Sequence, residues 1–227
     1  MIKFENTSVF NFENALRGMR NPLNSWDKID SKYCLPNMCL TCKKCNADEN
    51  NDIDWTPYQI GENDLNLATK LVKAGSEHRK FLRQIFVSVD ITAPLYWWKQ
   101  FDTYKIGTVS NSCSTMHKIH SKEFTINDFS YGDMSVGGLK TLYYIIETLN
   151  LARRYYLKEN KKDQSYWLDM IKLLPEAYNQ KRTITMNYEN LISICSQRNG
   201  HKLQEWHDFV DWVSDLPYAK NIIFIKD

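Results

Sequence analysis

Residues 84–92 alternate between apolar and polar positions, which is the period of a strand with one buried face. The apolar positions are Ile85, Val87, Val89 and Ile91. Because proline cannot donate a hydrogen bond to a sheet, we expect Pro94 to end this strand. An aromatic-rich helix is predicted to follow over residues 95–104.

Four other segments carry apolar residues at the spacing of an amphipathic helix. They cover residues 63–75, 139–157, 187–198 and 202–216. Asn63 or Asp64 is predicted to cap the first of these helices, and Gly75 to end it. The apolar run over residues 222–225 predicts a terminal strand. Strands combined with several long helices define an α/β or α+β domain.

The composition narrows the class of protein that this sequence encodes. Its 227 residues are 43% hydrophobic and 13% aromatic, which argues against disorder and allows a sizeable core. A formal net charge of +2 leaves no general electrostatic footprint for nucleic acid. There is no apolar run near the roughly 18 residues of a membrane helix, and the start lacks a hydrophobic stretch, so we expect no secretory signal. We therefore expect a soluble cytoplasmic protein, bacterial or viral in a host cell, without a membrane or nucleic-acid partner.

Residues 27–63 are polar and rich in Cys, Asn and Asp, which indicates an insertion or a long loop. Four cysteines, here called the cysteine quartet, lie there with the spacing C-x4-C-x2-C-x2-C. They are Cys34, Cys39, Cys42 and Cys45. Thiolates bind metals, so the quartet favours a structural metal, zinc ahead of an iron–sulfur cluster. Reduced thiols and disulfides are the alternatives, and in each case the quartet would stabilise the insertion. Cys195 lies among apolar helix positions and is predicted to be buried.

Residues 106–117 are dense in hydroxyl, amide and thiol side chains. Such a run after a helix suits a loop that offers hydroxyl and backbone N–H groups to a ligand. Gly107 would permit a close approach of that ligand, and Lys105 would add a point charge for a phosphate. An ordinary polar loop is the alternative interpretation.

The order of residues around this loop resembles that of the flavin-dependent thymidylate synthases, the ThyX family. In that family a helix end with a His precedes a strand, an Ala-Pro or equivalent, a Gln and the signature R-H-R-x-x-S-x-N-E-x-S-x-R-Y. Aligned from Ala93-Pro94, His78 falls on the family's first His and Gln100 on its Gln. The resemblance spans roughly residues 63–210. Its downstream part rests on Leu174, Pro175, Asn187, Leu191, Arg198, His201 and Glu205.

The signature residues themselves have changed. The positions that align with them are Thr103, Tyr104, Lys105, Thr108, Ser110, Asn111, Cys113, Thr115 and Met116. A shift by one residue would restore Asn111 and Ser114, and Glu189 stands where the family has another Arg. Arginine is a permanently charged, bidentate anion clamp. The changes therefore remove positive charge where the family holds its flavin and the nucleotide phosphate.

The resemblance implies a single ThyX-like domain over residues 1–227, of the α/β (α+β) class, with a central mixed sheet flanked by long helices. It also implies a homotetramer whose active sites are built from several chains. FAD and a nucleotide would be held at the matching positions. These are His78, Gln100, Tyr104, Lys105, Thr108, Ser110, Asn111, Ser114, Asn187 and Arg198. Cys113 is a candidate nucleophile, provided that a neighbour such as Lys105 lowers its pKa.

Two functions follow from this resemblance. In the first, the protein is a divergent FAD-dependent synthase that methylates dUMP with a one-carbon unit from methylenetetrahydrofolate, while NADPH reduces the flavin. In the second, it is a catalytically inactive ThyX-fold protein that senses or sequesters a nucleotide signal. The enzyme must retain a redox cofactor, whereas the binding protein need not. A partner-binding role of the Cys-rich insertion is the remaining alternative.

Overall fold

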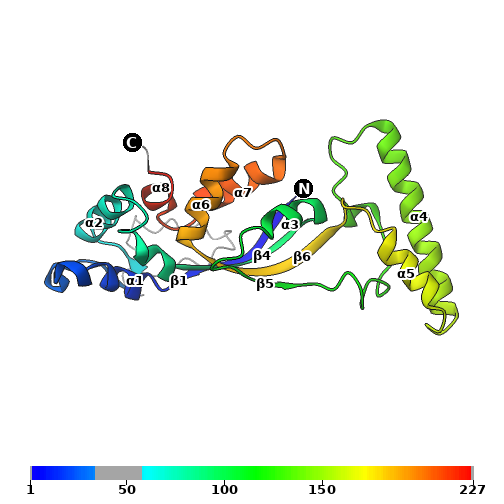
Figure 1. Ribbon diagram of the computed structural model, residues 1–227, viewed down its shortest axis with the longest axis horizontal. Helices are drawn as coiled ribbons and strands as arrows, with labels where there is room; N and C mark the ends of the chain where they lie inside the picture. Colours follow the sequence, from blue (N-terminus) through cyan, green and yellow to red (C-terminus); the bar gives the residue numbers. More distant parts are fainter. Residues whose placement is uncertain (1, 34–57, 226–227) are drawn as a thin grey trace, which may run out of the picture. The chain divides into compact units, whose positions relative to one another are not determined.

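The computed structural model describes residues 2–33 and 58–225 (Figure 1). This part of the chain forms two compact units. Unit 1 consists of residues 1–3, 91–103 and 111–182. Unit 2 consists of residues 4–90, 104–110 and 183–227. The organisation as one domain with an insertion at residues 27–63 stays a prediction.

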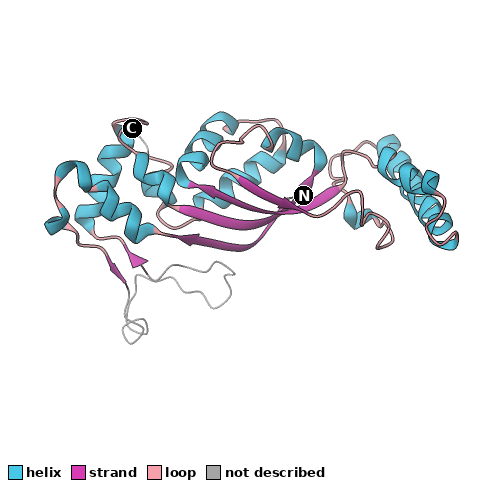
Figure 2. Cartoon of the chain, turned by 60° about the horizontal axis from the view of Figure 1, so that its bottom comes forward, coloured by secondary structure: helices cyan, strands magenta, loops and turns pink. Residues whose placement is uncertain are grey.

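Four antiparallel strands form the main sheet, drawn in magenta in Figure 2. In their order across the sheet they are β1 (Lys3–Phe10), β4 (Phe86–Pro94), β6 (Asn179–Asn187) and β5 (Val109–Ser112). The hydroxyl of Thr183 donates to Asp90 at 2.6 Å, and the hydroxyls of Thr185 and Ser88 lie 3.5 Å apart. Residue numbers therefore fall along β4 as they rise along β6. The α+β class is confirmed, but the strands are antiparallel where a mixed sheet was expected.

Strand β4 confirms the strand predicted at residues 84–92. Val87, Val89 and Ile91 are at most 1% exposed, and they alternate with half-buried residues as the period-two pattern requires. The strand ends at Pro94, which begins helix α3 (Leu95–Phe101) as its N-cap. Residues 106–117 are not wholly a loop, because β5 lies within them. All four residues of β5 are exposed, so no buried face marks this strand in the sequence.

Unit 2 contains most of the helices. They are α1 (Phe12–Met19), α2 (Glu62–Lys73), α6 (Tyr188–Arg198), α7 (Gln204–Ser214) and α8 (Ala219–Ile222), with 3-10 turns η1 (Asn21–Leu23), η2 (Trp26–Lys28) and η4 (Lys80–Gln84). The helices predicted near residues 63–75, 187–198 and 202–216 are thus confirmed. Cys195 of α6 is buried as predicted, and burial raises the pKa of its thiol to about 12.

The strand predicted at residues 222–225 is wrong. Helix α8 covers the start of this run, and Ile222 is fully buried. The backbone N–H of Ile222 donates to the Tyr218 carbonyl at 3.0 Å, as in a helical turn. A short apolar run is buried equally well as a helix or as a strand, so hydrophobicity alone does not distinguish them.

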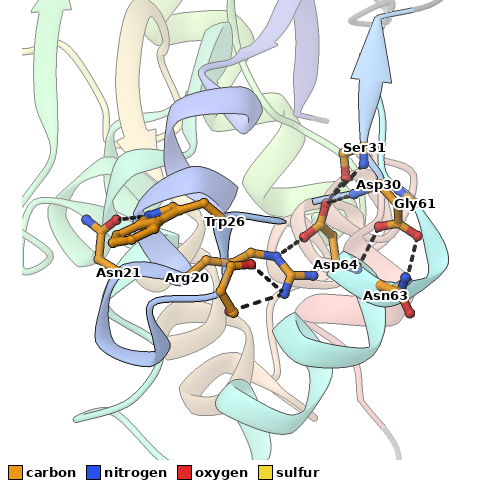
Figure 3. A network of polar contacts seen from close by, with 9 residues as sticks. Arg20, Asn21, Trp26, Asp30, Ser31, Gly61, Asn63 and Asp64 are labelled. Carbon is orange, nitrogen blue, oxygen red and sulfur yellow. Dashed lines mark hydrogen bonds and ion pairs between the residues drawn. The ribbon is translucent and has the colours of Figure 1, made fainter. Parts of the chain in front are cut away.

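A buried ion pair joins α1 to α2 in unit 2 (Figure 3). Nε of Arg20 donates to Oδ1 of Asp64 at 2.6 Å, and both side chains are at most 4% exposed. Asp64 is therefore not the helix cap that the sequence predicted. Its other oxygen accepts from the Ser31 hydroxyl at 2.6 Å and from the backbone of Asp30 and Ser31. Asp30 in turn accepts from the backbone N–H groups of Asn63 and Asp64, at 2.9 and 3.0 Å.

A two-stranded sheet with two residue pairs lies next to this network in the sequence. Strand β2 (Lys32–Tyr33) pairs antiparallel with β3 (Tyr58–Gln59), with Tyr33 opposite Tyr58. The rings of the two tyrosines pack edge to face with centres 5.0 Å apart. The two described residues that flank positions 34–57 are thus direct neighbours.

Unit 1 is built on helices α4 (Val136–Lys158) and α5 (Gln164–Lys172) together with α3. The helix predicted at residues 139–157 is confirmed; it starts earlier because the Ser135 hydroxyl accepts from the backbone N–H of Gly138 at 3.1 Å. The aromatic helix α3 buries Trp97, Trp98 and Phe101, as its composition indicated. No helix in the described ranges is long and apolar enough to cross a membrane.

Candidate functional site

In unit 2, residues 104–110 lie against helix α6, and this contact is the candidate site. At its first end, Asn187 and Asn190 cap each other's backbone N–H groups at 3.0 and 3.1 Å. Asn190 also donates from its amide to the carbonyl of Ile106 at 2.7 Å. The N-terminus of α6 therefore fixes the middle of the segment.

Gly107 is required by this contact. Its φ is +76°, a conformation that side chains with a Cβ rarely adopt. A Cβ there would also lie 3.0 Å from the amide nitrogen of Asn187 and from the amide oxygen of Asn190. The close approach predicted for Gly107 therefore occurs, but it is made to these two asparagines of the chain itself.

At the other end of α6, Arg198 is held by two aromatic residues. Its Nε donates to the hydroxyl of Tyr104 at 2.8 Å. Its guanidinium carbon lies 4.5 Å from the ring centre of Trp206, which is fully buried, and 5.4 Å from that of Tyr104. Cation–π contacts of this kind fix the plane of a guanidinium. The eleven residues of α6 separate this end from Asn187 by about 16 Å.

His201 lies beside the same cluster, with its ring centre 6.2 Å from that of Trp206. Burial lowers the pKa of this imidazole, and the positive charge of Arg198 and the neighbouring His207 lower it further. His201 therefore stays neutral to a lower pH than an ordinary histidine. The arrangement keeps Arg198 as the main positive charge of the cluster near neutral pH.

Glu189, on the first turn of α6, is neutralised within the chain. Arg79 clamps its carboxylate with two parallel contacts, Nε to Oε2 at 2.9 Å and Nη2 to Oε1 at 3.1 Å. Both side chains are about four-fifths buried, at 22% and 18% exposure. Because Arg79 neutralises it, Glu189 is expected to repel a phosphate less than an unpaired carboxylate would. His78, which was predicted to bind the cofactor or the nucleotide, is exposed and immediately precedes Arg79.

The predicted site residues are divided between the two units. Unit 2 holds His78, Tyr104, Lys105, Thr108, Ser110, Asn187 and Arg198. Unit 1 holds Gln100, Asn111, Cys113 and Ser114. In unit 2, Asn187 lies at the start of α6 and Arg198 at its end, where Tyr104 contacts Arg198. Thr108 donates from its hydroxyl to the carbonyl of Tyr104, whereas Lys105 and Ser110 are exposed.

In unit 1, Cys113 and Ser114 follow the exposed strand β5. The backbone N–H of Cys113 donates to the carbonyl of Lys181 at 2.9 Å, and its carbonyl accepts from the Gln180 amide at 2.7 Å. The Cys113 side chain is exposed. Ser114 accepts from the backbone N–H groups of Met116 and His117, so its hydroxyl closes a turn. Asn111 is exposed and Gln100 is half-buried.

Three residues of the candidate site were not assigned to it from the sequence. Asn190 stands three positions after Asn187, which is the spacing of a capping box, and this signal was available. Trp206 was assigned to the core by its periodicity; it is buried, but it also supports Arg198. Arg79 had no signal, because its partner Glu189 lies 110 positions away in the chain.

The cysteine quartet of the predicted metal site lies outside the described residues. Within the ranges that the structure does describe, no group of three or more His, Cys, Asp or Glu side chains is placed to hold a metal ion. The predicted zinc or iron–sulfur site therefore stays a prediction.

The fold is similar to that of solved flavin-dependent thymidylate synthases. Two solved structures of ThyX from Helicobacter pylori with FAD and dUMP are similar to it with a TM-score of 0.64. Their sequences are 13% and 14% identical to this chain, and the matches cover 98% and 99% of it and 97% of each of those chains. A UMP/dUMP methylase, PolB from Streptomyces cacaoi bound with 5-Br UMP, matches with a TM-score of 0.51 and 14% identity, over 70% of this chain and 78% of that one. Neither a family model nor the sequence of a curated protein matches this sequence.

Proposed function

We propose that this protein binds a pyrimidine nucleoside monophosphate through residues 104–110 and helix α6. The observation that carries the proposal is the position of Arg198, whose guanidinium is held by Tyr104 and Trp206. A guanidinium matches the geometry of a phosphate, and one that is already fixed loses less entropy on binding. Lys105, exposed on the same segment, adds a second positive charge.

The fold supports a pyrimidine as the base. The similar structures hold dUMP or 5-Br UMP, and both ligands carry a uracil-type base with one phosphate. Trp206 is fully buried, so its part is to position Arg198 and not to stack with the base. The segment between Tyr104 and Ser110 would provide the ligand's surroundings, together with the exposed His78 at the other end of α6.

The residues of this chain fit a monophosphate better than FAD. Four positions that align with family arginines hold Thr103, Lys105, Thr115 and Glu189. Lys105 alone of these is a cation, and Arg79, which lies next to Glu189, is already committed to its carboxylate. A flavin dinucleotide carries two phosphate charges and gains most from paired arginines. The proposal is therefore a nucleotide-binding protein of the ThyX fold that senses or sequesters its ligand.

FAD-dependent methylation of dUMP is the second candidate, favoured by the two similar structures that contain FAD. FAD, when bound and once reduced by NADPH, would supply the electrons for the reduction that accompanies methylation. The exposed Cys113 is the candidate nucleophile of this second function. A homotetramer, as the resemblance implies, is part of both candidates.

Calorimetric titration with dUMP, UMP and dAMP tests the first candidate. Arg198→Ala is expected to weaken dUMP binding about 10- to 100-fold, since it removes a charge-assisted bond worth about 1.5–3 kcal/mol. Arg198→Lys keeps the charge but loses the stacked, planar fork, so an intermediate affinity is expected. Arg154→Ala, at an exposed position of α4, is the control. Equal binding of dAMP, or an unchanged affinity of Arg198→Ala, would contradict the proposal.

The visible absorption spectrum of freshly purified protein separates the two candidates. A flavin band that persists through gel filtration would favour the enzyme, and methylation of dUMP would then be assayed. A colourless protein that binds dUMP would support the binding protein. A broad brown absorption would instead indicate an iron–sulfur cluster at the cysteine quartet.

A further inference from the structure

Among the described residues of unit 1, three cations surround one imidazole. The imidazole is that of His120, and the cations are Lys118, Arg153 and Lys161. Lys118 and Lys161 are exposed, whereas Arg153 and His120 are half-buried. Within residues 58–225, no carboxylate forms an ion pair with any of these cations. Like charges repel each other, so a group of this kind is favoured when an anion joins it.

Two segments far apart in the sequence build this group. Ile119 is 4% exposed and packs with Tyr156 of α4 in the core of the unit, so Lys118 and His120 flank a buried position. Nε of Arg153 donates to the carbonyl of His120 at 3.0 Å and ties the turn to the helix. The rings of His120 and Tyr156 pack edge to face with centres 5.2 Å apart. The imidazole is therefore held in place by α4.

Lys161 reaches the group from beyond the end of α4. Its φ is +63°, and its backbone N–H donates to the carbonyl of Tyr156 at 2.9 Å, so the chain turns back over the last turn of the helix. Burial lowers the pKa of His120, and the charges of Lys161, Lys118 and Arg153 lower it further. The three cations thus lie close enough to the ring to act on it.

The two ring nitrogens of His120 differ in their surroundings. Nδ1 is buried and has no hydrogen-bond partner among the described residues. Nε2 is not one of the buried atoms that lack a partner, so it is open to solvent. Buried N–H groups without an acceptor are rarer in proteins than unpaired acceptors, so we expect the proton of the neutral ring on Nε2. Arg153 uses only Nε for the His120 carbonyl, which leaves its two Nη groups for a ligand.

This group offers several donors and three positive charges to solvent. A phosphate group carries about two negative charges near neutral pH and has three or more acceptor oxygens. Guanidinium and ammonium groups are the usual partners of such an anion. We propose that Lys118, His120, Arg153 and Lys161 form a binding site for a phosphate group, either as the free ion or as a phosphate ester. These four residues are here called the unit 1 anion site.

The negative charges on the flanking segments do not cancel this site. Asp128 is paired with Lys122, and Asp163 accepts from the hydroxyl and the backbone N–H of Ser165 at 2.6 and 2.9 Å. The C-terminus of α4 carries a partial charge of about −0.5, which is small against three cations. That partial charge attracts cations from the end of the helix itself, but Lys118 comes from another segment.

The site goes beyond the proposed function, because none of its residues belongs to residues 104–110 or to α6. It lies in unit 1, whereas Arg198 belongs to unit 2. Failure of one site to bind its ligand therefore leaves the other untouched.

A proton NMR titration of the full-length protein tests the site through the His120 ring, which His120→Phe identifies among the five histidines. Sulfate is the first probe, because its two charges stay constant between about pH 5 and 8. It is compared with sodium chloride at equal ionic strength, since screening alone shifts titrations. A bound dianion favours the imidazolium, so sulfate is expected to raise the His120 midpoint by at least about 0.5 pH unit.

The variant that combines Lys118→Gln and Lys161→Gln removes two of the three charges and is expected to abolish this rise. Lys140→Gln is the matched control, because Lys140 is exposed on α4 about 20 Å before Arg153. Arg198→Ala should also keep the rise, which separates this site from the proposed nucleotide site. Circular dichroism verifies that each variant keeps its helix content.

Inorganic phosphate and ribose 5-phosphate then distinguish the two sources of the phosphate group. Tighter binding of ribose 5-phosphate identifies an ester as the ligand, and otherwise the free ion is the ligand. In both cases the double variant is expected to raise the dissociation constant at least about tenfold. The proposal is overturned if sulfate leaves the His120 midpoint unchanged, if the double variant keeps the rise, or if Lys140→Gln abolishes it as well.

Discussion

Replacing Asp64 with asparagine is the sharpest test of the buried network that joins α1, α2 and residues 30–31. Asp64 is 0% exposed and accepts four hydrogen bonds: from Arg20, from the Ser31 hydroxyl, and from the backbone of Asp30 and Ser31. In Asp64→Asn the side-chain N–H₂ group cannot accept a hydrogen bond, so at least one of these four donors would face another donor. The change also removes the negative charge that compensates the guanidinium of Arg20, whose side chain is 4% exposed.

The expected cost follows from the burial of this charge. Removing one partner of a buried ion pair costs about 3–5 kcal/mol, because the other charge stays buried without compensation. The other bonds of Arg20 are weak replacements: Nη1 lies 3.4 Å from the carbonyl and from the hydroxyl of Ser25. Within the described ranges, Nη2 of Arg20 has no hydrogen-bond partner. We therefore expect Asp64→Asn to lower the free energy of unfolding by about 3 kcal/mol or more.

Urea unfolding followed by tryptophan fluorescence measures this difference. Asp27→Asn, at an exposed carboxylate of the same segment, is the control and should change the free energy by no more than about 0.5 kcal/mol. In an Arg20→Met background the cost of Asp64→Asn should fall by about 2 kcal/mol, because no buried guanidinium remains. A loss below about 1 kcal/mol for Asp64→Asn, or an equal loss in both backgrounds, would refute the reasoning.

Further predictions concern single residues of the site and the core. Iodoacetamide followed by peptide mass analysis should modify the exposed Cys113 and leave Cys195 unmodified, because burial raises the Cys195 pKa to about 12; fast alkylation of Cys195 in the folded protein would contradict this. Gly107→Ala should lower the free energy of unfolding by about 1–2 kcal/mol in the same urea assay, because φ is +76° there, and no loss would mean that the turn relaxes. In a proton NMR titration the midpoint of the His201 ring should lie below about pH 6.5, and a midpoint above pH 6.5 would contradict this. Because the pKa of His201 is lowered in the folded state, protonation of this ring favours unfolding as the pH falls. Elemental analysis of the purified protein should find zinc or iron, and substitution of the cysteine quartet by serine should remove it; metal-free native protein would leave thiols or disulfides.

The elements that the sequence predicted are those with strong periodicity. Strand β4 and helix α4 each bury one face, so their apolar residues recur at the right spacing. Strand β6 (Asn179–Asn187) was not predicted from the sequence, although it lies inside the sheet. Its residues are mostly polar, and only Ile184 and Met186 are apolar and buried in the core. Strand β1 was missed for a similar reason, since Val9 is its only fully apolar buried residue.

Some residues of the candidate site could be named from the sequence, but their contacts could not. The resemblance pointed to Tyr104, Asn187 and Arg198, and the structure brings these residues to one helix. The pair between Arg79 and Glu189 could not be predicted, because tertiary contacts between distant positions leave no mark on local spacing. This ion pair matters for the proposed function, because Arg79 compensates the negative charge with which Glu189 would otherwise repel an anion.

The pairing of β2 with β3 defines a point at which the chain can be shortened. Tyr33 faces Tyr58, so the described residues on either side of positions 34–57 are neighbours, and such opposed residues can be joined by a tight two-residue turn. A shortened chain should begin its deletion after Tyr33, because Asp30 and Ser31 hold Asp64. We expect the same point to accept a foreign domain or a fluorescent reporter, because Tyr33 and Tyr58 can stay paired when a domain is inserted between them.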